Sequence, residues 1–122
     1  MQMANSNTTA TSVHVKVTVD PANSEAFLRA LEPTYKNVIA EPLNIFVEVY
    51  RDEQNPGVFK LVENWNAALE YLMSVQAKKE YYNHYREHVE PLFIKPQETE
   101  IFSRIPGNSW ASVRGEFYPS RE

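Results

Sequence analysis

The chain has 122 residues, of which 43% are hydrophobic and 23% charged, and these values are typical of one globular domain with a modest core. Its formal net charge of −4 argues against nucleic acid as a partner, because binding to nucleic acid calls for a basic surface. The sequence contains no cysteine, which excludes disulfides and thiolate chemistry.

The composition divides the chain into an N-terminal arm (1–11), one folded domain (12–106) and a C-terminal tail (107–122). The arm is rich in Asn, Thr and Ser and lacks the basic and apolar regions of a secretion signal. No apolar run approaches the roughly 20 residues that cross a bilayer. We therefore predict a cytoplasmic protein with no membrane or nucleic-acid partner.

The first predicted strand covers Val13–Val19, where valine alternates with polar residues. Such alternation is typical of a strand with one buried face. Asp20 stops this strand, and Asn23 or Ser24 can cap the helix that follows. Pro33 is expected to kink that helix without necessarily ending it.

A β-hairpin comes next, with strand-like runs at Asn44–Arg51 and Val58–Trp65. The turn between them is rich in Asp, Asn, Pro and Gly, the residues that hairpin turns favour. A long helix is predicted over about 67–88 and a last strand over 98–105. The order is β-α-β-β-α-β, which predicts an α+β, ferredoxin-like fold with one antiparallel sheet and both helices on one face.

The second strand of this sheet is apolar on both faces. Ile45, Val47 and Val49 share one parity, and Phe46 and Tyr50 share the other. A sheet that is apolar on both faces must be covered twice, and the helices cover only one face. We therefore expect a homodimer in which two sheets pack face to face.

Glu63 and Trp65 share one face of the third strand. If this face looks toward the helices, Trp65 is the wall of a pocket and Glu63 is a carboxylate in an apolar space. Its pKa would then be raised, which suits a base that takes a proton from a phenol. The alternative is a core tryptophan beside a carboxylate that a basic side chain or the backbone holds.

On the long helix, Tyr82, Tyr85 and Val89 form the stripe that faces inward at helical spacing. Tyr81 and Arg86 flank this stripe on opposite sides. A cleft between these rings would suit a flat aromatic substrate, and Arg86 could stabilise a phenolate or enolate at its rim. Core filling is the alternative, although buried tyrosine hydroxyls need partners, which favours a wet pocket.

The chain has three histidines, two of them on the predicted long helix and one on the first strand. His84 and His88 match the His-x-x-Glu-His spacing of one class of zinc peptidase, but the inward stripe turns His84 away from the core. We therefore predict no metal site. His88 remains a candidate catalytic residue at the edge of the pocket. His14 could be the proton acceptor if the valines of its strand face the partner, and otherwise lies near the dimer interface. Tyr50 on the second strand likewise faces either the pocket or the dimer interface, depending on which side of the sheet the helices cover.

Three segments of the chain have a recognisable order and spacing, namely Val47–Asp52, Phe59–Trp65 and Val89–Leu92. Together they resemble the antibiotic biosynthesis monooxygenase family over roughly residues 13–105. The resemblance implies a dimeric ferredoxin-like α/β barrel. It also implies an activity, because the better-known members oxidise phenolic polyketide intermediates with molecular oxygen and use no flavin, haem or metal.

The resemblance transfers Trp65, Asn64 and Glu63 as pocket residues. It does not transfer the family's helix histidines, since Tyr81 stands at one of their places. The first hypothesis is therefore a cofactor-independent oxygenase that acts on a small aromatic or polyketide-type substrate. The second is an isomerase, cyclase or decarboxylase that uses proton transfer alone. The third is a non-enzymatic binding or scaffolding dimer with its pocket filled by side chains.

Overall fold

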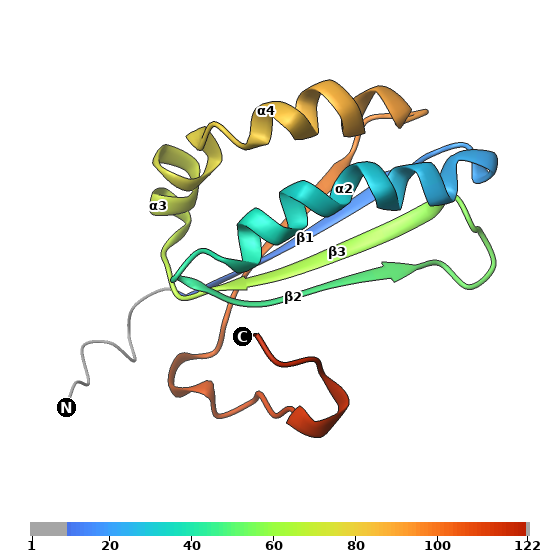
Figure 1. Ribbon diagram of the computed structural model, residues 1–122. Coiled ribbons are helices and arrows are strands. Elements are labelled where there is room, and N and C mark those ends of the chain that lie inside the picture. Colours follow the sequence, from blue (N-terminus) through green and yellow to red (C-terminus); the bar gives the residue numbers. More distant parts are fainter. Residues whose placement is uncertain (1–9, 122) are drawn as a thin grey trace.

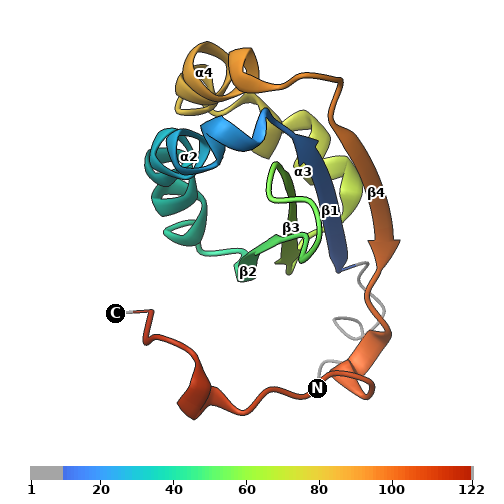
Figure 2. The same cartoon turned by 90° about the vertical axis from the view of Figure 1, so that its right-hand side faces the viewer.

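The computed structural model describes residues 10–121, so residues 1–9 of the predicted arm lie outside it (Figure 1). One antiparallel sheet has the order β2-β3-β1-β4, with β1 at Thr11–Thr18, β2 at Asn44–Arg51, β3 at Val58–Trp65 and β4 at Glu98–Ser103. Helix α2 (Ser24–Ile39) and the helical segments that follow β3 lie on the same face of this sheet (Figure 2). The predicted α+β, ferredoxin-like fold is confirmed.

Strand β1 lies in the interior of the sheet and determines which way its neighbours face. Val15 pairs with Leu61 of β3, and Val17 pairs with Phe59. Residues directly opposite each other in an antiparallel ladder point to the same side of the sheet. All four are buried, so this side faces the helices. His14, on the other parity, faces away from them.

Helix α2 packs on the sheet through Phe27, Leu31 and Val38, which are buried and recur at the spacing of an amphipathic helix. Pro33 lies inside α2, and the helix continues past it to Ile39. The expectation that Pro33 need not end the helix is confirmed.

Asn23, one of the two predicted cap residues, is the N-cap residue of α2. A 3₁₀ turn precedes the helix, and the carboxylate of Asp20 accepts a hydrogen bond of 2.9 Å from the backbone N–H of Ala22 in that turn. The side chain of Asn23 makes no capping bond. Ser24 instead donates its hydroxyl to the carbonyl of Pro56 at 2.6 Å, which ties the helix start to the hairpin turn.

The prediction of one long helix over 67–88 is wrong, because the helix is interrupted there. Its pieces are α3 (Leu69–Ser74), a 3₁₀ turn (Gln76–Lys78), α4 (Tyr82–His84) and a π-helical turn (Tyr85–Val89). Further 3₁₀ turns occur at Pro21–Asn23, Glu90–Leu92, Pro106–Asn108 and Gly115–Phe117. Within residues 10–121, no helix has the length and apolar character needed to cross a membrane.

Gln76 explains the break. It is 4% exposed, and its amide donates hydrogen bonds to the hydroxyls of Tyr81 at 2.7 Å and Tyr82 at 2.9 Å. In an unbroken helix, residues five apart point about 140° away from each other, so Gln76 could not reach Tyr81. Lys79 has an extended backbone with ψ of 140°, which turns the chain and brings the two side chains together.

The other face of the sheet is partly covered by the chain's own tail, which passes beneath it (Figures 1 and 2). The ring of Tyr118 packs edge to face on Phe46 with 5.9 Å between centroids, and its hydroxyl donates to Glu48 at 3.2 Å. The guanidinium of Arg121 donates to the side-chain oxygen of Asn44 at 2.8 Å. The tail therefore contacts the sheet along β2.

Gly57 is required by a close approach of two backbones. Its carbonyl accepts a hydrogen bond of 2.7 Å from the N–H of Val19, and a Cβ at Gly57 would collide with the carbonyl oxygen of Val19. We predict that Gly57→Ala lowers the free energy of unfolding by about 1–3 kcal/mol. Urea unfolding measures the change. Gly115→Ala is the matched control, since nothing lies near its Cβ; equal losses in both variants would contradict the prediction.

Candidate active site

A cavity of about 310 Å³ lies between the sheet and the helices that cover it. Much of its wall is apolar, with Val13 and Val15 from β1 and Val47 and Val49 from β2. The volume is at the lower end of the range for small-molecule sites. A compact ring compound is the kind of ligand that this space admits.

Glu63 and Trp65 of β3 both line the cavity. The indole N–H of Trp65 donates a hydrogen bond of 3.0 Å to the carboxyl of Glu63. Burial raises the pKa of Glu63, and the bond from Trp65 offsets this only in part. Within residues 10–121, no salt bridge includes Glu63. The carboxyl is thus held by an indole and not by a basic side chain, which leaves it free to exchange a proton with a ligand.

Tyr82, Tyr85 and Arg86 line the cavity from the helical side. The hydroxyl of Tyr85 donates to the side-chain oxygen of Gln97 at 2.9 Å. Burial raises the pKa of both tyrosines, so each remains a neutral hydroxyl. Arg86 is exposed at the rim, where its guanidinium donates to Asn83 at 2.7 Å. Tyr82 and Tyr85 of the predicted inward stripe therefore border the cavity, with the Arg86 guanidinium at its rim, whereas Val89 is packed in the core.

Two wall residues, Thr34 of α2 and Gln76, were not predicted from the sequence. The hydroxyl oxygen of Thr34 and the amide oxygen of Gln76 are buried and have no hydrogen-bond partner within residues 10–121. Such a group costs about 1–3 kcal/mol when it stays unsatisfied. For Thr34 a signal existed, because it lies on the same side of α2 as Leu31 and Val38.

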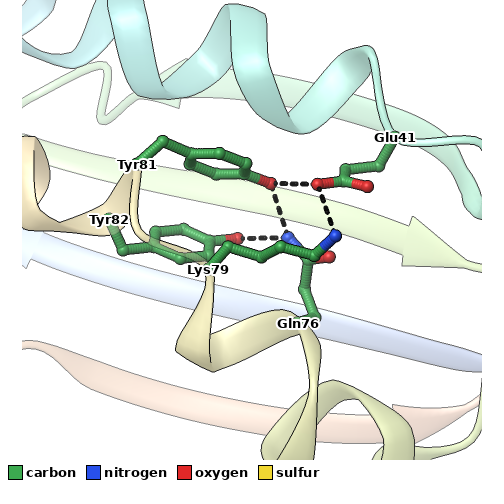
Figure 3. A network of polar contacts seen from close by, with 5 residues as sticks. All are labelled: Glu41, Gln76, Lys79, Tyr81 and Tyr82. Carbon is green, nitrogen blue, oxygen red and sulfur yellow. Dashed lines mark hydrogen bonds and ion pairs between the residues drawn. The ribbon is translucent and has the colours of Figure 1, made fainter.

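Tyr81 lies beside the cavity and not in its wall. Its hydroxyl donates to the carboxylate of Glu41 at 2.8 Å and accepts from Gln76, as Figure 3 shows. The ammonium of Lys79 lies 3.6 Å from the same carboxylate. Tyr81 therefore contacts two residues of the cavity wall, Gln76 through its hydroxyl and Tyr82 through its ring, with 4.8 Å between the ring centroids.

Three predicted site residues lie on the opposite face of the sheet. His14 and Asn64 belong to the parity that points away from the helices, and the imidazole Nε2 of His14 lies 2.9 Å from the hydroxyl of Ser12. Tyr50 also points this way and donates its hydroxyl to Glu48 at 2.9 Å. The structure does not bring these three residues together with Glu63, because the sheet separates them from the cavity.

The two helix histidines also lie away from the cavity. The imidazole Nε2 of His84 donates to the backbone carbonyl of Ala30 in α2 at 2.9 Å. The ring of His88 is 4.6 Å from that of His84, measured between centroids, and His88 is exposed. Across residues 10–121, no group of three or more His, Cys, Asp or Glu side chains could hold a metal ion.

The fold and the site define a small ferredoxin-like protein with a mostly apolar cavity and a buried carboxyl. Residues 11–69 match the family described as antibiotic biosynthesis monooxygenase. A relative from Pestalotiopsis microspora, named "Putative monooxygenase", is 48% identical over 120 residues, which cover 98% of this chain and 100% of the relative. The chain belongs to the antibiotic biosynthesis monooxygenase family.

Solved structures show the same fold. A conserved protein from Methanosarcina mazei has a TM-score of 0.70 and 19% identity, over 83% of this chain and 97% of its own. A "Putative antibiotic biosynthesis monooxygenase" from Nitrosomonas europaea also has a TM-score of 0.70, with 20% identity over 80% of this chain and 91% of its own. At this identity the likeness concerns the fold alone.

The raised pKa of Glu63 has a consequence for stability. Because the folded state favours the protonated carboxyl, its contribution is present below the unfolded pKa, near the model-compound value of 4.5, and is lost as pH rises through the folded pKa. We predict that Glu63→Gln becomes progressively more stable relative to the unmodified protein as pH rises above 4.5. Urea unfolding across this pH range tests it, and a stability difference that stays constant with pH would refute it.

Proposed function

We propose that the protein is a small oxygenase that oxidises a phenolic ring compound with molecular oxygen. The observation that carries the proposal is the buried Glu63 carboxyl in a mostly apolar cavity, bonded to Trp65 and without a basic partner among the described residues 10–121. The relative named as a monooxygenase supports the same class of reaction. The chemistry would take place inside the cavity, against its mostly apolar wall.

Glu63 would begin the reaction by accepting the phenolic proton. A carboxyl whose pKa is raised by burial is a stronger base than one in water, which makes this transfer easier. Trp65 and the rings of Tyr82 and Tyr85 would hold the aromatic plane. The hydroxyl of Tyr82 or the guanidinium of Arg86 would stabilise the phenolate oxygen.

The phenolate would then supply the electrons for oxygen. One electron passes to dioxygen, the two radicals combine at a ring carbon, and the new C–O bond gives a peroxide that takes the proton back from Glu63. Loss of the proton on that carbon turns its C–H electron pair into the C=O bond of a quinone as the O–O bond breaks. The hydroxide that leaves takes up a proton and becomes water. Overall, one phenol and one dioxygen give one quinone and one water.

The same cavity also suits proton transfer without oxygen, as in an isomerase, cyclase or decarboxylase, because Glu63 would serve there as well. The third hypothesis, a binding or scaffolding dimer with a pocket filled by side chains, is less well supported, since open space lies beside Trp65. Dependence on oxygen separates the first two functions.

We predict that the protein consumes one dioxygen per molecule of 1-naphthol or a related hydroxylated naphthalene converted to a quinone. Glu63→Gln should slow this reaction by about 10²–10⁴-fold, because the amide cannot accept the proton. An oxygen electrode and product absorbance measure both. Glu53→Gln, in the exposed hairpin turn, makes the same chemical change outside the cavity and should leave the rate unchanged.

Two other results would change the assignment. Conversion that proceeds equally well without oxygen would favour the proton-transfer enzyme. A panel of hydroxylated naphthalenes and anthrones that neither binds nor reacts would reject the oxygenase altogether.

A homodimer is the second part of the proposal. The outer face of the sheet carries Phe46, Val62 and Phe102, and Phe102 is 48% exposed. We predict a mass by light scattering of twice the 14.1 kDa of one chain, and a shift toward the monomer in Phe102→Glu. Met73→Glu, at an apolar position on α3 that is 63% exposed, is the control. A monomeric unmodified protein would reject the dimer.

A further inference from the structure

A chain of hydrogen bonds connects the protein surface to the cavity wall, and Figure 3 shows its members. The carboxylate of Glu41 lies 3.6 Å from the ammonium of Lys79 and accepts a hydrogen bond of 2.8 Å from Tyr81. Gln76 Nε2 lies 2.7 Å from the Tyr81 oxygen and 2.9 Å from the Tyr82 oxygen. Gln76 and Tyr82 line the cavity, so the chain ends there.

The direction of each bond follows from what the groups can donate. Glu41 can only accept, so the single hydroxyl proton of Tyr81 is directed toward it. Burial and the bond to Glu41 both raise the pKa of Tyr81, which keeps this proton in place. The Tyr81 oxygen must therefore accept from Gln76. This fixes the orientation of the amide, with its NH₂ group toward the two tyrosines.

One hydrogen-bond donor and one acceptor then remain unused at the cavity wall. The NH₂ group of Gln76 donates to the oxygen of Tyr82, so the hydroxyl proton of Tyr82 is available to a ligand. The amide oxygen of Gln76 points away from both tyrosines, is fully buried and has no hydrogen-bond partner within residues 10–121, so a ligand donor reaches it only when this part of the wall shifts on binding. A buried amide oxygen in this state calls for a hydrogen-bond donor.

We propose that Tyr82 and Gln76 form a paired recognition site, oriented by Glu41 and Tyr81, for a ligand with an anionic oxygen beside a hydroxyl group. The Tyr82 hydroxyl donates to the anionic oxygen, and the Gln76 oxygen accepts from the neighbouring hydroxyl. The unused atoms belong to a hydroxyl and an amide in contact with each other, so the ligand groups that meet them are close neighbours. The substrate class is thus an ortho-dihydroxy ring, bound as its monoanion.

This inference rests on the proposed function because it concerns the same cavity, but it can be tested without any reaction. In the proposed recognition site, Tyr82 and Gln76 contact the ligand, whereas Tyr81 and Glu41 are positioning residues. Without Tyr81, the amide of Gln76 is no longer held in one orientation. Its oxygen can then accept from Tyr82, which removes both the donor and the acceptor from the ligand.

The probes are two chromophores that differ in one group, 4-nitrocatechol and 2-methoxy-4-nitrophenol. Both present an acidic phenol whose anion absorbs visible light, and only the first has a neighbouring hydroxyl. Binding is measured under nitrogen by absorbance titration at a pH where both phenols are ionised in solution. The unmodified protein should bind 4-nitrocatechol at least tenfold more tightly than the methoxy compound.

Three variants separate recognition from folding. Gln76→Met keeps the volume but removes the amide, and should reduce the preference for 4-nitrocatechol to below threefold. Tyr81→Phe should reduce it similarly, although Tyr81 lies outside the cavity wall. Tyr71→Phe makes the same change in a partly buried ring that packs against the core cluster containing Trp65, and should keep the full preference. Thermal unfolding checks that each variant is folded.

The outcomes are distinct. Equal affinity of the unmodified protein for the two probes, no binding of either, or a preference that survives in both Gln76→Met and Tyr81→Phe would overturn the inference. A preference that Tyr71→Phe also loses would overturn the assignment to this chain of bonds. If the preference follows the prediction while no oxygen is consumed with any phenol, the recognition site stands and the oxygenase proposal fails.

Discussion

The period-two geometry of β1 is the constraint on which the rest of the structure depends. Its valines face the helices, and each pairs across the ladder with a residue that must share this side. Val13 lies opposite Glu63, and Thr11 lies opposite Trp65, so both site residues of β3 are placed under the helices. A slip of one residue would carry Glu63 to the other face. The hydroxyl of Thr11, which donates to the carbonyl of Ala67 at 2.8 Å, anchors the same end of the sheet.

The cavity lies where two packed clusters meet. One is built around Phe27 and Phe59, and the other around Val38, Trp65 and Leu72. Protein interiors are close-packed and contain few voids larger than a water molecule. The lining of an open space loses dispersion contacts that a filled core would make. A hollow of about 310 Å³ with a carboxyl in its wall is therefore a space in which a ligand can supply the contacts that the lining lacks.

Local sequence signals predicted the strands well and the helical segment poorly. The bounds of β2 and β3 match the prediction, because alternation and turn residues are read within a few positions. The break after α3 depends on Gln76, whose bonds to Tyr81 and Tyr82 exist only in the folded chain. For His14, the alternation defined two faces but not which one the helices cover, so its position required the structure.

The two tryptophans of the chain occupy opposite environments. Trp65 is 1% exposed and bonded to a carboxyl, whereas Trp110 in the tail is 84% exposed. An indole in an apolar interior emits at shorter wavelength than one in water, so the intrinsic fluorescence of the protein is a sum of two separable signals. The short-wavelength component originates at the wall of the cavity. The chain thus carries its own optical reporter of events at that wall, with no label attached.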